Sequence, residues 1–524
     1  MKSRIFTLTF LCLILAGAFL LRVYKIADKP VWYDEASSIA HAQKPLGSYL
    51  TSFRLAYKPV YFFMLNRWSC LFGEGAFYLR FFSLIWGVLT ILLIYKLSSL
   101  IFDEETGLIS AFILSISVFH IFHCQQIRQF SLVVFLATAS FYYFSRYSGA
   151  GRIGDLLVLL LTNILLINTY PTGVYVVLVE MIFAGLYFRE ALMRHWVYAQ
   201  VLLSVFIVRL ALSLDQEHIK EFIWWIPRPS FAAIVETFHT LSWGGARYGL
   251  DDFKVIFPAP WLLWGISLSY LFFLWRGLRW RGQDKKMMLV VLWLALPVAA
   301  IFMQSLFYIG SFYSIKHLII VLPAFCMLVA RGIAGLKMRW RVISLAILFC
   351  ANLVPLSTMY NIYFAPDWKS CGHFMRDAAK EGDALIVSPL HEVVPFMYYF
   401  SHKTRALADM DMYGHITAGG GYNSIFKTEN DISIIGIKQS GVGDNTLSAE
   451  NDFRLKFFKY GLGKPRSVWT VLMRGTHPDT RQVIFGLLKR SLSPSKCVYF
   501  HDIEVCHFEP ASRLTPEARD IDQR

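Results

Sequence analysis

Long apolar segments recur along the chain from its first residues to about residue 360. Each is roughly 17 to 24 residues long, enough for an α-helix to cross the ~30 Å hydrocarbon core of a bilayer. The pattern predicts a polytopic α-helical membrane protein with about eleven transmembrane helices. The expected spans are 5–21, 79–102, 107–122, 128–145, 153–168, 170–188, 195–213, 259–275, 287–304, 314–330 and 342–359.

From about residue 365 the pattern changes to that of a water-soluble domain, with helix-like and strand-like segments in alternation. "KSCGHFMRDAAKEG" and "DTRQVIFGLLKRSL" have the apolar spacing of amphipathic helices. Short apolar runs predict strands. We therefore expect a membrane domain at 1–364 and an α/β sandwich domain at 365–524. The expected strands are "DALIVSP", "DISIIGI", "SVWTVLMR", "CVYFHDI" and "EVCHFEP".

The amino-acid composition is also that of a membrane protein and leaves the predicted architecture unchanged. The 524 residues are 56% hydrophobic and 17% charged, whereas a soluble domain has about 25% charged residues. The net charge of +15 would suit a nucleic-acid-binding protein. The basic residues, however, cluster at the ends of the apolar segments, where membrane orientation places them. We therefore expect no nucleic-acid partner.

The loop charges predict the orientation. If the N-terminus is cytoplasmic, the short cytoplasmic loops are rich in Lys and Arg, and only "FDEET" at 102–106 is not. The short loops on the other side, near 123–127, 169 and 305–313, contain neither. This is the positive-inside pattern. The cytoplasmic basic residues are Arg146, Arg152, Arg189, Arg194, Arg276, Arg279, Arg281, Lys285, Lys286, Arg331, Lys337, Arg339 and Arg341.

Eleven spans put the C-terminal domain outside the cytoplasm, together with the long loops 22–78 and 214–258. The first segment has a basic start and an Ala-Gly-Ala that a cleaved signal peptide would also have, but we expect an uncleaved helix. Within the first long loop, "YKPVYFFMLNRWSCLFGE" is apolar but interrupted by charges, which predicts a helix lying on the membrane surface. The second long loop is rich in Trp and Pro and is expected at headgroup level.

The eight cysteines show no metal-binding spacing. Five lie in or beside apolar segments and are expected to be small core residues. Cys497 and Cys506 flank "VYFHDIEV", and a hairpin there would bring them together. They form a disulfide if the domain lies in an oxidising compartment and stay free thiols if it does not. Cys371 then has no obvious partner.

An ordered series of motifs covers most of the first 390 residues. It runs from "WYDEA" and "KPVYFFMLNRWSCLFGEGAFYLRFFSLIWGVL" through "CQQIRQFSLV" and "YSIKHLIIVLPAFCMLVARGI" to "PDWKSCGHFMRDAAKEGDALIVSP". The series resembles membrane glycosyltransferases of the GT-C fold, in particular the protein O-mannosyltransferase and lipid A aminoarabinose transferase superfamily. The chain departs from the family at Lys316 and His317, where the family usually has Arg-Tyr.

The resemblance implies transfer of a hexosyl or pentosyl group from a polyprenyl-phosphate donor to an acceptor glycolipid, cell-envelope glycan or protein. The site would face the periplasm, on the outer face of a bacterial cytoplasmic (inner) membrane. The anomeric configuration would invert, because one displacement forms no glycosyl-enzyme intermediate. Membrane lipids are the other expected partners. No cofactor and no metal site are expected, and dependence on a divalent metal stays open.

The acidic pair in "VWYDEASSIA" is the candidate catalytic group. The acceptor loses a proton as it attacks the anomeric carbon, so a carboxylate within hydrogen-bond reach acts as general base. Asp34 is the first choice and Glu35 the second; one of them could instead orient the other or hold a cation. Alternatively, the pair only begins a short helix, because acids favour a helix N-terminus.

Basic residues are the candidate ligands of the donor phosphate. A departing lipid phosphate needs preorganised cations, and charges at the membrane edge are costly and tend to be functional. Lys58, Arg80 and Arg128 are candidates from their positions, and Lys316 and His317 from the resemblance. The alternatives are an interfacial lysine at 58 and flanking membrane anchors at 80 and 128.

Other readings of the sequence remain. Asp409-Met410-Asp411 is a DxD triplet of the kind found in metal-dependent nucleotide-sugar sites, but a surface loop is expected. A GT-C oligosaccharyltransferase or a diphosphate-carrier ligase would be a rival enzyme. A lipid-linked-sugar transporter or flippase without transferase activity is the rival of another class. It predicts internal repeats and mid-membrane charges, and the sequence contains no convincing repeat.

Overall fold

The computed structural model describes residues 2–44, 59–213, 226–244, 260–279, 285–307, 311–361, 366–401, 423–427, 432–437, 466–474, 478–490 and 492–510. The chain divides into two compact units. The helical unit comprises Met1–Ala27 and Pro45–Phe364, and the sheet unit comprises Asp28–Lys44 and Ala365–Arg524. The segment that carries the acidic pair therefore packs with the C-terminal residues.

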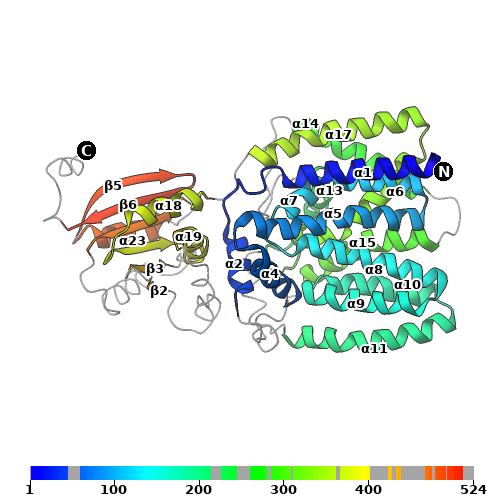
Figure 1. The fold of residues 1–524 in the computed structure, drawn as a ribbon, viewed down its shortest axis with the longest axis horizontal. Helices are drawn as coiled ribbons and strands as arrows, with labels where there is room; N and C mark the ends of the chain where they lie inside the picture. Colours follow the sequence, from blue (N-terminus) through cyan, green and yellow to red (C-terminus); the bar gives the residue numbers. More distant parts are fainter. Residues whose placement is uncertain are drawn as a thin grey trace. The chain divides into compact units, whose positions relative to one another are not determined.

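All of the predicted spans are helical in the helical unit, and its long helices run side by side (Figure 1). The helices, including the short 3₁₀ helix η2, are α1 (Lys2–Val23), α4 (Pro59–Phe72), α5 (Ala76–Ile101), α6 (Glu104–Ile116), α7 (Val118–Cys124), α8 (Phe130–Ala150), α9 (Ile153–Thr169), α10 (Gly173–Tyr187), α11 (Glu190–Ser213), α13 (Phe231–Trp243), α14 (Pro260–Leu278), α15 (Lys285–Phe307), η2 (Ile315–Val321), α16 (Leu322–Ala334) and α17 (Met338–Asn361).

Among the described residues, 5 helices are long and apolar enough to cross a membrane. They are α1 from Ile5, α5, α15, η2 joined to α16, and α17. The pair α6 and α7, bent by 62°, would make a sixth. The chain is thus a multi-pass membrane protein, whereas the predicted count of eleven spans is not confirmed.

Local sequence explains the break between α6 and α7. Asp103 begins α6 by accepting a hydrogen bond from the backbone N–H of Thr106 at 2.8 Å, as helix-capping acids do. At the break Ser117 is extended, and its hydroxyl accepts from the N–H of His120 at 3.4 Å. A new cap in the middle of an apolar run therefore ends one helix and begins the next.

The sheet unit contains a six-stranded mixed sheet. The strand order is β2-β3-β1-β4-β6-β5, and β1 pairs in parallel with both β3 and β4, while the other pairs are antiparallel. Its elements are α2 (Tyr33–Ala42), α18 (Trp368–Ala378), β1 (Ala384–Ser388), η3 (Leu390–Glu392), α19 (Val393–Phe400), β2 (Asn423–Lys427), β3 (Ser433–Ile437), β4 (Val468–Met473), α23 (Pro478–Leu488), β5 (Ser493–Phe500) and β6 (Ile503–Glu509).

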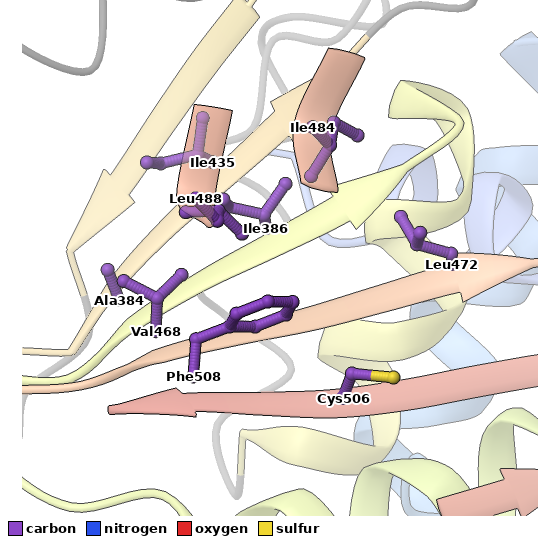
Figure 2. Packing of buried hydrophobic residues seen from close by; sticks show 9 residues of the cluster. All are labelled: Ala384, Ile386, Ile435, Val468, Leu472, Ile484, Leu488, Cys506 and Phe508. Carbon is purple, nitrogen blue, oxygen red and sulfur yellow. The ribbon is translucent and has the colours of Figure 1, made fainter. Parts of the chain in front are cut away.

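Helices cover both faces of the sheet. On one face Ile484 and Leu488 of α23 pack on a buried cluster that includes Ile386 and Phe508 (Figure 2). On the other face Phe374 of α18 meets the ring of Trp469 edge-on, with centroids 6.1 Å apart. Strand β1 is buried throughout, as expected of a parallel strand covered on both sides. The expected α/β sandwich is thus present.

The predicted strands and helices of this unit all appear, and three elements, β2, η3 and α19, were not predicted. Strand β2 begins at Asn423, at the end of the glycine-rich run "AGGG", and α19 was missed altogether. The structure joins Cys497 on β5 to Cys506 on β6 in a disulfide, while Cys371 is a buried free thiol. The DxD triplet at 409–411 lies outside the described residues.

Candidate functional site

Arg128 and His123 lie together near the start of α8 in the helical unit. The Arg128 guanidinium is 5.8 Å from the centroid of the Phe130 ring, and the His123 ring packs on the same ring at 4.8 Å. The positive charges of Arg128 and Lys316 both act on His123. This places Lys316, from a segment distant in sequence, in the same electrostatic neighbourhood as Arg128.

Tyr170 links this group to His317. Its ring contacts Phe130 at 5.6 Å and His317 at 5.6 Å between centroids. The structure therefore brings together three of the predicted phosphate ligands, Arg128, Lys316 and His317, which we call the cationic group. The cationic group lies around the rings of Phe130 and Tyr170. Its two members on η2, Lys316 and His317, are half-buried.

The 3₁₀ turn η2 fixes the His317 ring. Its Nδ1 lies 2.9 Å from the backbone carbonyl oxygen of Phe312. A carbonyl oxygen only accepts, so Nδ1 carries a proton. Nε2 is the ring nitrogen that remains for interactions with other groups. In the neutral ring Nε2 is then an acceptor, and it donates to an anion only when the imidazole is protonated.

Arg80 is buried on α5, with 2% of its surface exposed. Its Nη1 donates to the carbonyl oxygen of Ile26 at 2.9 Å. One turn further along α5, the Ser83 hydroxyl donates to the backbone carbonyl of Arg128 at 3.3 Å. Arg80 thus lies one helical turn before Ser83, the residue that contacts the Arg128 backbone. Its bond to Ile26 also holds the segment that follows α1.

Arg22 is a buried residue that the sequence pattern did not single out. It is fully buried in α1 and donates to the carbonyl oxygens of Ser115 at 2.9 Å and Leu114 at 3.2 Å. Its Nη2 lies 2.7 Å from Nδ1 of His120. Since a guanidinium only donates, the His120 proton is on Nε2. Arg22 thereby gives a donor to the carbonyl of Ser115 and a second donor to that of Leu114, which also accepts from the N–H of Ser117 where α6 ends.

Buried polar atoms without a partner gather around α7. Within the described part of the chain, Nε2 of His120, Oε1 of Gln125 and both amide atoms of Gln129 make no hydrogen bond. Buried polar groups normally have a partner, from protein, water or ligand. This part of the helical unit therefore has donors and acceptors available to a polar ligand or to ordered water.

The acidic pair lies in the first turn of α2, in the sheet unit. Asp34 is half-buried, and Glu35 is 1% exposed. Trp32 precedes the helix in an extended conformation. The expectation that the two acids begin a short helix is therefore right. Acids at this position interact favourably with the helix dipole, which holds whether or not they also have a catalytic role.

Two ionisable residues of η3 lie beside the acidic pair. The Tyr33 ring of α2 meets the His391 ring edge-on at 5.1 Å, and Nε2 of His391 is 3.5 Å from Oε1 of Glu392. Burial raises the pKa of Glu392 to about 7; the negative charge of Asp34 adds to the increase, and the Trp368 indole opposes it. Burial also lowers the pKa of His391, which the Asp34 charge partly offsets.

Lys58, directly before α4, lies outside the described residues. Among the residues that are described, one group has the spacing of metal ligands: Cys497, Glu504 and Cys506. Two of its members form the disulfide, which leaves their sulfurs unavailable as thiolate ligands.

Sequence signals existed for some of the missed residues. His391 and Glu392 stand between an apolar strand and the apolar stretch "VVPF", where burial is expected and ionisable groups are costly. Arg22 ends the first apolar segment and looks like an ordinary flanking residue. Its burial arises from the α6–α7 break, a feature of tertiary structure.

Comparison with solved structures shows the fold. ArnT from Cupriavidus metallidurans in its apo state matches with a TM-score of 0.58 and 13% identity, over 97% of this chain and 98% of that one. The same protein bound to undecaprenyl phosphate matches with a TM-score of 0.55 and 13% identity, over 96% and 99%. A comparison with curated protein sequences found no match.

A third structure extends the likeness beyond ArnT. Archaeal oligosaccharyltransferase AglB from Archaeoglobus fulgidus, in complex with an inhibitory peptide and a dolichol-phosphate, matches with a TM-score of 0.54 and 12% identity, over 98% of this chain and 75% of that one. At the level of sequence, residues 57–213 match the family model "Dolichyl-phosphate-mannose-protein mannosyltransferase". These residues therefore resemble that family, and the chain as a whole has the fold of ArnT and AglB.

Proposed function

We propose that the protein transfers a sugar from a polyprenyl-phosphate donor to an acceptor, with inversion of the anomeric configuration. The observation that carries the proposal is the cationic group of Arg128, Lys316 and His317 around the rings of Phe130 and Tyr170. The similar structures were determined with undecaprenyl phosphate in ArnT and with a dolichol-phosphate in AglB.

The cationic group provides what departure of a lipid phosphate requires. Negative charge grows on the phosphate oxygen as the glycosidic bond breaks, and fixed cations in a water-poor site stabilise that charge. Arg128 suits the phosphate because a guanidinium offers paired donors. Lys316 contributes a point charge, and His317 contributes an N–H donor at Nε2 in its protonated form. Lys58 and Arg80 are proposed as additional cations of the same site.

Asp34 is proposed as the general base and Glu35 as the second choice. The base accepts the proton of the acceptor hydroxyl or amine as that group attacks the anomeric carbon. Asp34 is half-buried, whereas Glu35 is almost fully buried, and this difference favours Asp34. A single displacement by the acceptor accounts for inversion.

The proposed location is the outer face of a bacterial cytoplasmic membrane, with the sheet unit in the periplasm. The disulfide between Cys497 and Cys506 supports an oxidising compartment for that unit, and the Lys and Arg content of the loops supports the same orientation. We further propose that 1–364 is the transferase domain and that 365–524 helps to select the acceptor.

The rival hypothesis of a transporter gains little support from Glu180, a buried acid of the helical unit. Glu180 of α10 is fully buried, as a transport pathway would require of a proton-binding group. It is, however, bonded to Ser140 on α8 and accepts from Asn163 on α9 at 2.8 Å. A carboxyl satisfied by two neighbouring helices is better explained as a packing element.

The test is a transfer assay with purified protein and a panel of radiolabelled polyprenyl-phosphate sugars. Transfer to an acceptor extract, or slow hydrolysis of one donor, would support the proposal and identify the sugar. Movement of intact donor across liposome membranes without transfer would replace it with the flippase reading.

A further inference from the structure

Basic side chains gather in the helical unit where α14 and α16 end and where α15 and α17 begin. Most of them are exposed, and those in the last turns of α14 and α16 are half-buried. The proposed sugar transfer uses none of these residues. We call the group the basic surface, and its members are Arg276, Arg279, Lys285, Arg331, Lys337 and Arg339.

Close packing of α14 against α16 forms the centre of the basic surface. A Cβ on Gly277 would overlap the backbone carbonyl of Leu328, and a Cβ on Gly332 would overlap a backbone carbonyl of α14. Glycine at both positions allows the two backbones to touch. Across this contact Arg276 donates to the carbonyl oxygens of Gly332 at 3.2 Å and Gly335 at 3.3 Å. The arginines of the two helix ends are therefore held beside each other.

Further contacts extend the surface to α15 and α5. Nη1 of Arg331 lies 2.8 Å from Sδ of Met287, in the first turn of α15. The Arg331 guanidinium is also 5.0 Å from the centroid of the Phe102 ring, directly after α5. Nζ of Lys286 donates to the carbonyl oxygen of Leu100 at 3.1 Å. The ends of these helices thus form one continuous surface.

Aromatic and apolar neighbours indicate the depth of this surface in a membrane. The Arg279 guanidinium lies 3.9 Å from the centroid of the Trp275 ring. The Arg339 guanidinium lies 5.3 Å from that of Trp340. Both indoles are exposed, and so are the apolar residues that precede the two arginines in the chain. Tryptophan and basic residues side by side at the end of a span are typical of the headgroup region of a bilayer.

Other basic residues of the helical unit have acidic partners. Nε of Arg146 is 3.0 Å from Oδ1 of Asp155, and Arg341 on α17 forms an ion pair with Glu105. Within the described ranges, no acid pairs with a member of the basic surface. Orientation of the spans requires only positive charge in the loops. A concentrated set of cations without acidic partners additionally suits an anionic ligand.

We propose that the basic surface binds the headgroups of anionic phospholipids. Phosphodiester oxygens accept paired hydrogen bonds from a guanidinium and a point-charge contact from a lysine, and clustered Lys and Arg beside a span attract anionic lipids. An acidic protein would match the same charge. The exposed apolar side chains at the same depth, however, fit lipid chains better than a water-soluble partner. Such binding is separate from the proposed sugar transfer and does not depend on which leaflet the surface faces.

The test measures phospholipids bound to the purified full-length protein in a neutral detergent, by native mass spectrometry. Dioleoylphosphatidylglycerol, which is anionic, and dioleoylphosphatidylcholine, which is zwitterionic, are titrated separately. We expect the protein to bind phosphatidylglycerol at least about tenfold more tightly than phosphatidylcholine, and phosphatidylglycerol to raise the Tm more. Equal affinities for the two lipids would overturn the proposal without any variant.

A pair of double variants locates the binding. Arg279→Gln combined with Arg339→Gln removes two exposed charges of the basic surface, and Arg189→Gln combined with Arg194→Gln removes two exposed charges elsewhere in the helical unit. We expect the first to lower the affinity for phosphatidylglycerol about tenfold and the control to lower it less than about threefold. Both should keep the wild-type Tm in detergent without added lipid. An equal loss of affinity in the two variants, or no loss in the first, would overturn the proposal.

A competition experiment separates a lipid from an acidic protein as the partner. Polyglutamate is added to wild type that carries bound phosphatidylglycerol. We expect the lipid to stay bound, because its chains also contact the exposed apolar side chains. Displacement of the lipid by polyglutamate at equal concentration would overturn the proposal and favour an acidic protein.

Discussion

The guanidinium of Arg22, in the first helix, donates to the backbone carbonyl of Ser115, 93 residues away in the chain, at 2.9 Å. This bond pairs a buried carbonyl at the C-terminal end of α6, and Arg22 is also a second donor to the carbonyl of Leu114, which accepts from the N–H of Ser117 as well. The bend between α6 and α7 leads to His123 and Arg128, so Arg22 supports the backbone from which the cationic group is built.

Replacing Arg22 should destabilise the helical unit. Arg22→Leu leaves the buried carbonyl of Ser115 without its side-chain donor and the carbonyl of Leu114 with only the N–H of Ser117, at a cost of about 1–3 kcal/mol in the free energy of unfolding. We expect a clear decrease in Tm in detergent and a poor yield of monodisperse protein. Lys25→Leu is the control, because it removes an exposed hydrogen bond to Asn361 and a cation–π contact with Tyr24 but no bond to the end of α6. Equal Tm values for the two variants would contradict this role.

Arg128 should matter for the donor and not for folding. Loss of its charge from the cationic group should lower kcat/KM for the lipid-phosphate sugar by about 100-fold, with little change in Tm. Arg194→Ala provides the comparison, because Arg194 is exposed and pairs only loosely with Glu190 at 4.0 Å. Steady-state kinetics of Arg128→Ala and Arg194→Ala that agree within twofold would remove Arg128 from the phosphate site.

Glu180 should behave as a packing residue. Glu180→Gln keeps a hydrogen-bonding group against Ser140 and Asn163, so sugar transfer and Tm should stay near wild type. Glu180→Ala leaves Asn163 without its acceptor and opens a cavity, which should cost about 2–4 kcal/mol. Thermal unfolding distinguishes the two variants. Loss of function in Glu180→Gln with an unchanged Tm would instead point to a proton-binding role and revive the transporter reading.

The disulfide gives a test of compartment. Cys497 and Cys506 are directly paired across β5 and β6, and their loss should cost about 2–4 kcal/mol of the free energy of unfolding. In cells, neither thiol should react with maleimide until the protein has been reduced. Cys371→Ser is the matched comparison, because this residue is a buried free thiol of the same unit. Free Cys497 and Cys506 in freshly isolated membranes would place the sheet unit on the cytoplasmic side.

The sequence predicted the helices well, because apolar runs of this length have few other stable structures. Long runs such as 79–102 and 342–359 became α5 and α17 with small changes of boundary. The predicted span count is not confirmed, because α9 and α10 are shorter than the apolar helices that are long enough to span a membrane and a serine cap divides the apolar run of α6 and α7. Strand β2 was missed because it follows glycines, and α19 because "VVPFMYYF" has the composition of a strand as much as of a helix.

The candidate site could be predicted only in part. Arg128 stood out as a charge at a helix start, and Lys316 and His317 through family resemblance, and the structure brings the three together. The position of α2 beside His391 could not be predicted, because Tyr33 and His391, far apart in the chain, meet only through the packing of α2 with α19. Pairings of this kind depend on tertiary structure, which the local pattern does not contain.

The central claim is that Asp34 is the base of a sugar transfer. Its most direct test compares the rate of transfer from the preferred radiolabelled polyprenyl-phosphate sugar by wild type, Asp34→Asn and Glu35→Gln, each shown to be folded by its Tm. The account predicts a rate for Asp34→Asn that is lower by at least about 100-fold, with unchanged donor binding and a smaller loss in Glu35→Gln. A folded Asp34→Asn protein that transfers sugar at the wild-type rate would contradict it.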